Sequence, residues 1–139
     1  MLGVTYKSEA AHVFSDAEVE ELAEKAAEFN ASVGITGYLY YAHPVFLQYI
    51  EGETEAIESL MEQIAKDPRH TIVATAKDED RVSRRFPSWS MRLFQPGRDP
   101  EINLQSIWSD MLSIEALDWP GERSNSIWRC IEKISSTQA

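Results

Sequence analysis

The sequence predicts an α+β fold, a ferredoxin-like βαββαββ sandwich with two C-terminal helices packed on the sheet. Short β-rich segments alternate with only two helical segments before residue 96, a pattern that favours one sheet covered by both helices. The chain has 139 residues, of which 43% are hydrophobic and 26% charged, values typical of a single globular domain. The composition therefore argues against disorder, collagen and coiled coil.

The first strand and the first helix have clear local signals. Residues 2–6 form a short apolar run, which predicts a strand. Ser15 and Glu18 stand at the spacing of a capping box, so a helix begins after Ser15. Apolar residues then recur at helical spacing, and the helix is expected to end between Asn30 and Gly34.

The remaining elements of the first unit follow in order. Residues 35–41 and 45–50 are β-rich and predict a hairpin. A second helix follows Gly52 and is stopped by Pro68. Residues 71–76 and 88–94 predict two further strands. The last of these would carry three apolar side chains on one side, namely Trp89, Met91 and Leu93.

The sequence pattern changes after residue 96, where only helices are predicted. A helix is predicted to open at Asp99–Pro100, and a second amphipathic helix at residues 126–134. We therefore divide the chain into a domain of residues 1–96 and a helical extension of residues 97–139. The two helices are expected to pack on the open face of the sheet or on a partner. Cys130, on the last helix, is expected to be buried.

Charge and cysteine content exclude several classes of protein. The chain has 23 acidic and 13 basic residues, a formal net charge of -10, which disfavours binding to nucleic acid and to anionic membranes. A single cysteine forbids an intramolecular disulfide and favours the reducing cytoplasm. No apolar run approaches the ~20 residues of a spanning helix, and the N-terminus does not resemble a signal peptide.

The sequence contains no recognisable catalytic constellation. None of the three histidines stands at metal-ligand spacing, so no metal site is predicted. No phosphate-binding glycine loop and no serine or cysteine nucleophile motif is present. These observations favour a protein that is not an enzyme.

Two polar residues occupy apolar strand faces. Tyr6 shares a face with Val4, and Gln48 shares a face with Phe46 and Ile50. In a ferredoxin-like sheet the two strands are adjacent and central, so the phenol and the amide would meet under the helices. Periodicity alone leaves open the alternative that the Gln48 face is exposed to water.

Five segments in order resemble the BLUF family, blue-light sensors that use flavin. The match covers about residues 2–94 and resembles Y-x-S-x-A, N-x3-GITG, F-x-Q-x-L-E-G, D-x-R-H and R-x-F-x-x-W-x-M. The matching residues are Tyr6–Ala10, Asn30 with Gly34–Gly37, Phe46–Gly52, Asp67–His70, and Arg85–Phe86 with Trp89–Met91.

The resemblance implies a noncovalent flavin, usually FAD, between the two helices. Tyr6 would be the redox-active tyrosine and Gln48 the switching glutamine, while Asn30 would bond the polar edge of the ring. The resemblance also implies that Leu22 and Ile64 form the apolar walls on the two sides of the ring. Asp67, Arg69 and His70 would lie near the far edge of the ring and the side chain that bears phosphate. Ser8, Trp89 and Met91 would surround Gln48. Phe29 and Gln63 replace polar or basic residues of some members, so FMN or riboflavin remain alternatives to FAD.

The resemblance also implies a mechanism and a mode of output. Light would move an electron and a proton from Tyr6 through Gln48 and rearrange the hydrogen bonds around the flavin. No output enzyme is recognisable, so the chain resembles the short stand-alone type, which would signal through an unidentified partner protein and is expected to form a homo-oligomer.

Several alternatives remain at this stage. A flavin-free partner-binding domain and a small-molecule enzyme are both compatible with the fold class. Three tryptophans of the extension, Trp108, Trp119 and Trp128, either form an interface with the partner or cover the second face of the sheet.

Overall fold

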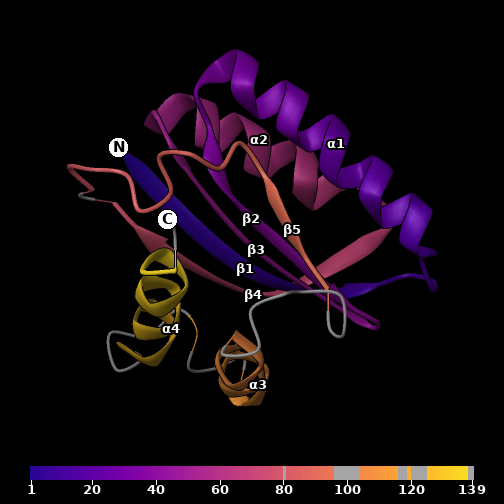
Figure 1. Cartoon of the computed structure of the whole chain (residues 1–139). Coiled ribbons are helices and arrows are strands. Elements are labelled where there is room, and N and C mark those ends of the chain that lie inside the picture. Colours follow the sequence, from indigo (N-terminus) through magenta and orange to yellow (C-terminus); the bar gives the residue numbers. More distant parts are fainter. Residues whose placement is uncertain (80, 96–103, 116–118, 120–124, 138–139) are drawn as a thin grey trace.

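A computed structural model describes residues 1–139 except residues 80, 96–103, 116–118, 120–124 and 138–139. Its elements are β1 (Leu2–Ala10), α1 (Asp16–Val33), β2 (Thr36–Ala42), β3 (Val45–Gly52), α2 (Thr54–Lys66), β4 (His70–Asp78), β5 (Arg92–Phe94), α3 (Leu104–Ser113) and α4 (Asn125–Ser135). The five strands form one sheet in the order β4-β1-β3-β2-β5. Only the β2–β5 pair is parallel among these neighbours. Helices α1 and α2 cover one face of the sheet, and α3 and α4 lie on the other (Figure 1). The predicted ferredoxin-like fold is confirmed.

The start and end of α1 follow from three residues. The Ser15 hydroxyl accepts a bond from the Glu18 backbone N–H at 3.2 Å, and the Glu18 carboxylate accepts one from the Ser15 N–H at 3.0 Å. These reciprocal bonds form the predicted capping box. They also lower the pKa of the Glu18 carboxyl, because its charged form is the better acceptor. At the other end, Gly34 adopts the left-handed conformation that terminates the helix.

Replacing Ser15 with alanine is expected to lower the free energy of unfolding by about 1 kcal/mol. The reason is that the Glu18 N–H, near the exposed start of α1, loses its side-chain acceptor. Urea denaturation followed by circular dichroism measures the change. Ser32→Ala, in the last turn of the same helix, is the matched control and should cost less. Equal losses in both variants would contradict the capping role.

The predicted last strand is wrong in part. Only Arg92–Phe94 pair with β2, while residues 88–91 form a turn and a bend. The Trp89 ring stacks on Phe86, with ring centroids 5.1 Å apart, in the layer of α3 and α4. Met91 and Leu93 instead face the layer of α1 and α2. The three side chains therefore do not share one face, since residues in a turn do not alternate as strand residues do.

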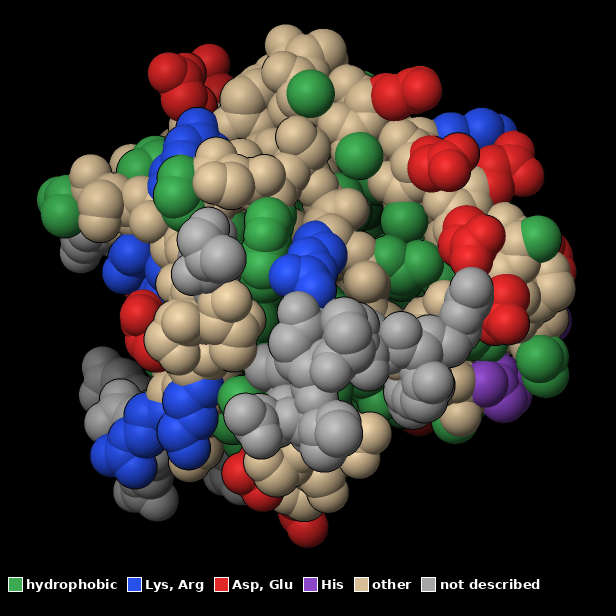
Figure 2. All heavy atoms as spheres, in the orientation of Figure 1, with side chains coloured by type: hydrophobic (Ala, Val, Ile, Leu, Met, Phe, Trp, Pro, Cys, Tyr) green, Lys and Arg blue, Asp and Glu red, His purple; other side chains and the backbone are tan. Residues whose placement is uncertain are grey.

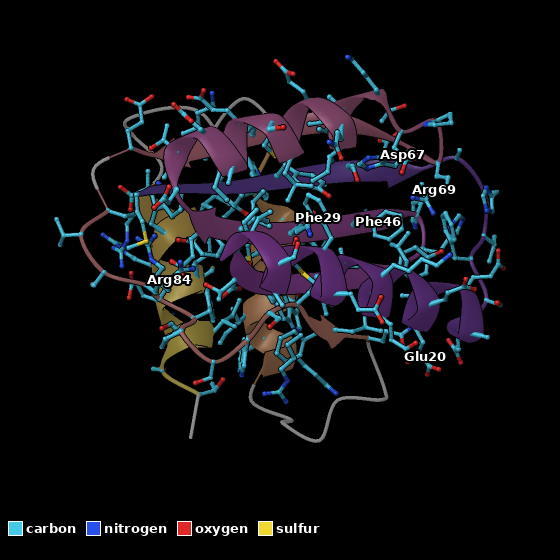
Figure 3. The ribbon with its side chains drawn as sticks, turned by 90° about the horizontal axis from the view of Figure 1, so that it is seen from above. Glu20, Phe29, Phe46, Asp67, Arg69 and Arg84 are labelled. Atoms are coloured by element: carbon cyan, nitrogen blue, oxygen red, sulfur yellow. The ribbon has the colours of Figure 1, made fainter. Side chains whose placement is uncertain are left out.

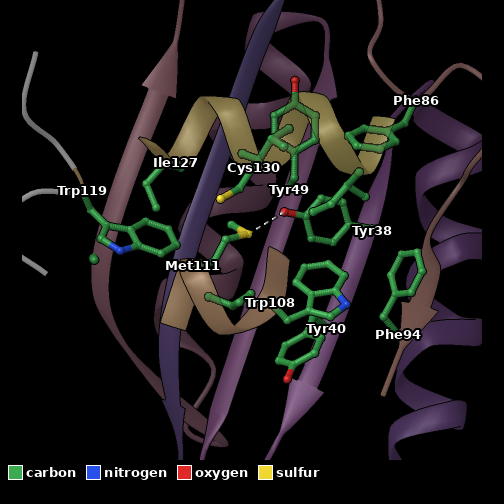
Figure 4. Close-up of a cluster of buried hydrophobic side chains, with 14 residues drawn as sticks. Tyr38, Tyr40, Tyr49, Phe86, Phe94, Trp108, Met111, Trp119, Ile127 and Cys130 are labelled. Carbon is green, nitrogen blue, oxygen red and sulfur yellow. Dashed lines mark hydrogen bonds between the residues drawn. The ribbon is translucent and has the colours of Figure 1, made fainter. Parts of the chain in front are cut away.

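The C-terminal helices cover the second face of the sheet. Tyr38 and Tyr49 project from the sheet towards α3 and α4, and the Tyr38 hydroxyl lies 4.0 Å from the Met111 sulfur (Figure 4). Cys130 is buried, as predicted, and burial raises the pKa of its thiol. Trp108 and Trp119 are buried in the same cluster, and Trp128 is half-buried against it. Covering the sheet is thus the role of Trp108 and Trp119. The predicted start of α3 at residues 99–100 lies outside the described residues.

The surface of the α1 side is strongly acidic. Figure 2 shows Asp and Glu side chains along the upper right of the molecule, where α1 lies in Figure 1. Within the described part of the chain, no helix has both the length and the apolar character needed to cross a membrane.

Candidate functional site

A cavity of about 500 Å³ opens between α1, α2 and the sheet. This volume lies in the range of small-molecule sites in proteins. Phe29 of α1 and Phe46 of β3 line it, and so do Asp67 and Arg69, which lie close together beside the end of α2 (Figure 3). Eight residues that the resemblance implies line the cavity: Tyr6, Leu22, Asn30, Gln48, Ile64, Asp67, Arg69 and His70.

Two side chains of the cavity floor, Tyr6 and Gln48, continue a hydrogen-bonded chain to Met91, which lies outside the cavity lining. Tyr6 and Gln48 are direct cross-strand partners, and the Tyr6 hydroxyl donates to Gln48 Oε1. Gln48 Nε2 in turn donates to the Met91 sulfur at 3.4 Å. Tyr6 is 3% and Gln48 6% exposed. The predicted meeting of Tyr6 and Gln48 is confirmed, and the alternative that the Gln48 face is exposed to water is wrong.

The Tyr6 phenol is held in its protonated form. Burial raises the pKa of Tyr6 far above its ordinary value, and the negative charge of Asp67 raises it further. The tightly bound proton lies in the hydrogen bond to Gln48, so this bond offers it a path out of the phenol. An amide both donates and accepts, so it can accept this proton at Oε1 while its nitrogen bonds elsewhere.

Asn30 ties α1 to the segment that precedes β5. Its side chain is 1% exposed, and Nδ2 donates to the Ser90 carbonyl at 3.0 Å. One residue earlier, the Trp89 carbonyl accepts from the Gly37 N–H at 2.8 Å. The segment 89–91 is therefore attached to α1, to β2 and, through Met91, to Gln48.

The end of the cavity near α2 is polar. Arg69 Nε bonds both Asp67 carboxylate oxygens, at 2.9 and 3.0 Å, and these bonds lower the pKa of Asp67. His70 Nδ1 lies 2.6 Å from the Ser8 hydroxyl, and His70 Nε2 lies 2.9 Å from the Ile64 carbonyl. Ser8 thus lies behind His70, outside the cavity lining.

The structure separates Trp89 from the other predicted site residues. Met91 contacts Gln48, whereas the half-buried Trp89 packs in the opposite layer against Phe86. Nine lining residues were not predicted as part of the site. They are His12, Phe14, Glu18, Glu21, Lys25, Ala26, Leu39, Phe46 and Leu60. The helical spacing of Ala26 with Leu22, and the alternation of Phe46 with Gln48, were the available signals.

The donor set and shape of the cavity fit a flavin. A flavin has a flat apolar ring with one polar edge, so it needs two apolar walls and an amide-rich edge. Leu22 and Ile64 supply walls from the two helices, and Asn30 and Gln48 place amides on the floor. At the cavity, Lys25 pairs with Glu21 at 2.9 Å and Arg69 pairs with Asp67. Phe29 and Gln63, which replace polar or basic residues of some members, both line the cavity.

The fold and the site together define a flavin-binding sensor domain, and comparisons with known proteins agree. Residues 1–92 match the family model BLUF, described as sensors of blue-light using FAD. Photoactivated adenylate cyclase subunit beta of Euglena longa is 34% identical over 89 residues, which cover 63% of this chain and 10% of that protein.

Solved structures extend the likeness. A bacterial light-regulated adenylyl cyclase aligns with a TM-score of 0.68 and 29% identity, over 81% of this chain and 33% of that one. BlrB, a BLUF protein in its dark state, aligns with a TM-score of 0.73 and 26% identity, over 99% of this chain and 96% of that one.

The chain belongs to the BLUF family of blue-light sensors. It is a flavin-binding photoreceptor, and its matched region is a sensor and not a catalyst. The enzyme and flavin-free alternatives are thereby excluded for residues 1–92. The chain spans about a tenth of the length of the photoactivated cyclase subunits that it matches.

Proposed function

We propose that the cavity holds FAD, with Leu22 and Ile64 against the faces of the ring. Asn30 and Gln48 would bond its polar edge, and Arg69 would lie near the side chain that carries the phosphates. The observation that carries the proposal is the buried Tyr6–Gln48 pair on the floor of a cavity of flavin size, with Met91 bonded to Gln48 behind it.

A bound flavin supplies blue-light absorption and, once excited, an acceptor for one electron. Tyr6 then gives up an electron, and its proton moves along the hydrogen bond to Gln48 Oε1. Gln48 would then rotate or change tautomer, so that its Nε2 would be free to leave Met91 and bond the cofactor instead. With the electron and proton back on Tyr6 and no covalent bond made, Gln48 would return to its first arrangement in the dark.

The direct test is an absorption spectrum of the purified chain in the dark and under blue light. We expect a yellow protein whose absorption edge moves to the red under light and returns in the dark. Mass spectrometry of the released chromophore distinguishes FAD from FMN and riboflavin. A chain that stays colourless after reconstitution with each flavin, or a spectrum that light does not change, contradicts the proposal.

We propose that the signal leaves through the segment from Arg85 to Met91. At one end, Met91 contacts Gln48. At the other, Arg85 Nε bonds Glu132 of α4, and Ser135 of α4 donates to the Arg85 carbonyl at 2.8 Å. Loss of the Gln48–Met91 bond would remove one of three attachments of residues 89–91, in a segment whose other end holds α4.

Replacing Glu132 with glutamine is expected to uncouple α4 from the photosite. The free energy of unfolding should fall by less than about 1 kcal/mol, because Glu132 is 55% exposed. The light-dependent change in hydrogen exchange of α4 should shrink at least about twofold, while the spectral shift remains. Arg129→Gln, on the exposed side of α4, is the control and should keep both responses. An unchanged α4 response in Glu132→Gln would contradict this route.

We propose that residues 1–96 form the photosensory domain and residues 97–139 its helical extension, which acts on a signalling partner. The end of the family match at residue 92 supports the boundary. The relatives include light-regulated adenylate cyclases, which supports a signalling partner. We also propose a cytoplasmic location, supported by the free and buried Cys130. A homo-oligomer remains a prediction, which light scattering in the dark and under light tests.

A further inference from the structure

Phe29 is an exposed aromatic side chain at the mouth of the cavity. Single exposed apolar residues are common on protein surfaces and carry no meaning by themselves. Among the described residues, the large apolar side chains that are exposed are Val13, Phe29, Val33, Val73 and Val82. Phe29 differs from the other four because it also lines the cavity. It is 42% exposed, so its ring faces both the cavity and the solvent.

The geometry of α1 places Phe29 at this opening. Leu22, Ala26 and Phe29 recur at helical spacing and all line the cavity, so they share one face of α1. The next residue, Asn30, is 1% exposed, and its side chain bonds the Ser90 carbonyl of the segment before β5. Successive residues of a helix point about 100° apart. Asn30 therefore points into the protein, whereas Phe29 points towards the opening between α1 and α2.

No other phenylalanine of the cavity lining occupies a comparable position within the described part of the chain. Phe14 and Phe46 also line the cavity, but they are only 7% and 4% exposed and belong to its interior. On the α2 side of the opening, Leu60 is half-buried and Gln63 is exposed. Phe29 is thus the aromatic ring that can lie between the interior of the cavity and water.

We propose that Phe29 is a cover that keeps water from the Tyr6–Gln48 pair and so lengthens the life of the red-shifted state. This inference rests on the proposed function, in which the dark return requires Gln48 to exchange its hydrogen bonds inside the cavity. Water that reaches an amide replaces the bonds being broken and lowers the free energy needed to break them. An apolar ring across the opening keeps this exchange dry, and the return is slow.

The test compares the rate of dark recovery in the full, flavin-loaded chain, followed as the absorption edge moves back. In Phe29→Ala we expect recovery at least about threefold faster, because water gains access to Gln48. Phe29→Leu keeps an apolar side chain of similar volume, so its rate should stay within about twofold of the wild type. Val33→Ala is the matched control, since Val33 is 39% exposed one turn later on α1 and lies outside the lining. It should recover at the wild-type rate.

Two measurements that need no photoreaction test the cover directly. Acrylamide, a neutral quencher dissolved in the water, should quench the fluorescence of the bound flavin more strongly in Phe29→Ala than in the wild type. The flavin-free Phe29→Ala chain should bind riboflavin at least about threefold more weakly, because less apolar surface is buried. Val33→Ala should match the wild type in both measurements. A saturating flavin concentration keeps Phe29→Ala loaded in the recovery and quenching experiments.

Wild-type recovery and quenching in Phe29→Ala overturn the inference, and so does an equal acceleration in Val33→Ala. Weaker riboflavin binding with unchanged quenching would show that the ring only adds affinity, which also overturns it. A yellow wild-type protein without any light response, by contrast, contradicts the proposed function and not the cover, on which quenching and riboflavin affinity still report.

Discussion

Tyr6→Phe is expected to abolish the light-induced red shift while the protein stays yellow. The substitution keeps the ring but removes the hydroxyl that donates to Gln48 Oε1, so the proton to be transferred is gone. Positioned proton transfer is worth about 10²–10⁴ in rate, and we expect the yield to fall by at least about a hundredfold. Absorption spectra before and after a calibrated blue flash measure it.

The matched control lies on the other face of the same sheet. Tyr38 is as buried as Tyr6, but its hydroxyl points to Met111 in the layer of α3 and α4 (Figure 4). Tyr38→Phe should therefore keep a normal red shift. Gln48→Leu should behave like Tyr6→Phe, because it removes the acceptor of the proton and leaves the walls of the cavity intact. A full red shift in either site variant would refute the assigned roles.

Gly37→Ala is expected to give the largest loss of stability among these substitutions. Gly37 has a φ of 154°, and a Cβ at this position would lie 1.8 Å from the Tyr49 carbonyl oxygen. The obstacle is the backbone of the paired strand β3, so β2 and β3 must separate locally. We expect the free energy of unfolding to fall by about 3 kcal/mol or more. The bond from Gly37 N–H to the Trp89 carbonyl would be disturbed as well.

Gly34→Ala offers the comparison for that experiment. Gly34 also has a positive φ, 70°, but the nearest atom to an added Cβ is an Arg84 side-chain nitrogen at 3.8 Å. Only the left-handed conformation then costs free energy, about 1–2 kcal/mol. Urea denaturation of both variants should rank Gly37→Ala well above Gly34→Ala. The reverse order would contradict the inference that the close approach of β2 and β3 makes Gly37→Ala the more destabilising substitution.

Local signals were enough for most elements but not for their ends. The capping box of Ser15 and Glu18 located the start of α1, because its bonds lie within four residues. The apolar run of β1 stops at Tyr6, yet the strand continues to Ala10. Both neighbouring strands pair with it beyond that point, and sequence patterns carry no signal for such long-range pairing.

The site was predictable where it depends on strand alternation, and not where it depends on tertiary contacts. Tyr6 and Gln48 meet because their strands are neighbours with a fixed register. Trp89 was misplaced because Gly37, about fifty residues earlier, holds its carbonyl and interrupts the alternation before β5. The polar lining residues Lys25 and Glu21 read as an ordinary exposed ion pair on α1, and only the fold shows that a cavity lies beside them.

Neighbouring residues of strand β3 belong to the two opposite sides of the sheet. Gln48 projects from it into the cavity, and the next residue, Tyr49, projects from the opposite side, where its hydroxyl bonds Glu51 at 2.9 Å and receives a bond from Arg85 at 3.0 Å. A single peptide unit thus separates the cavity from Arg85, which bonds Glu132 of α4. A rotation of this unit would displace both side chains, so β3 would connect the cavity to Arg85 in addition to the segment from Arg85 to Met91.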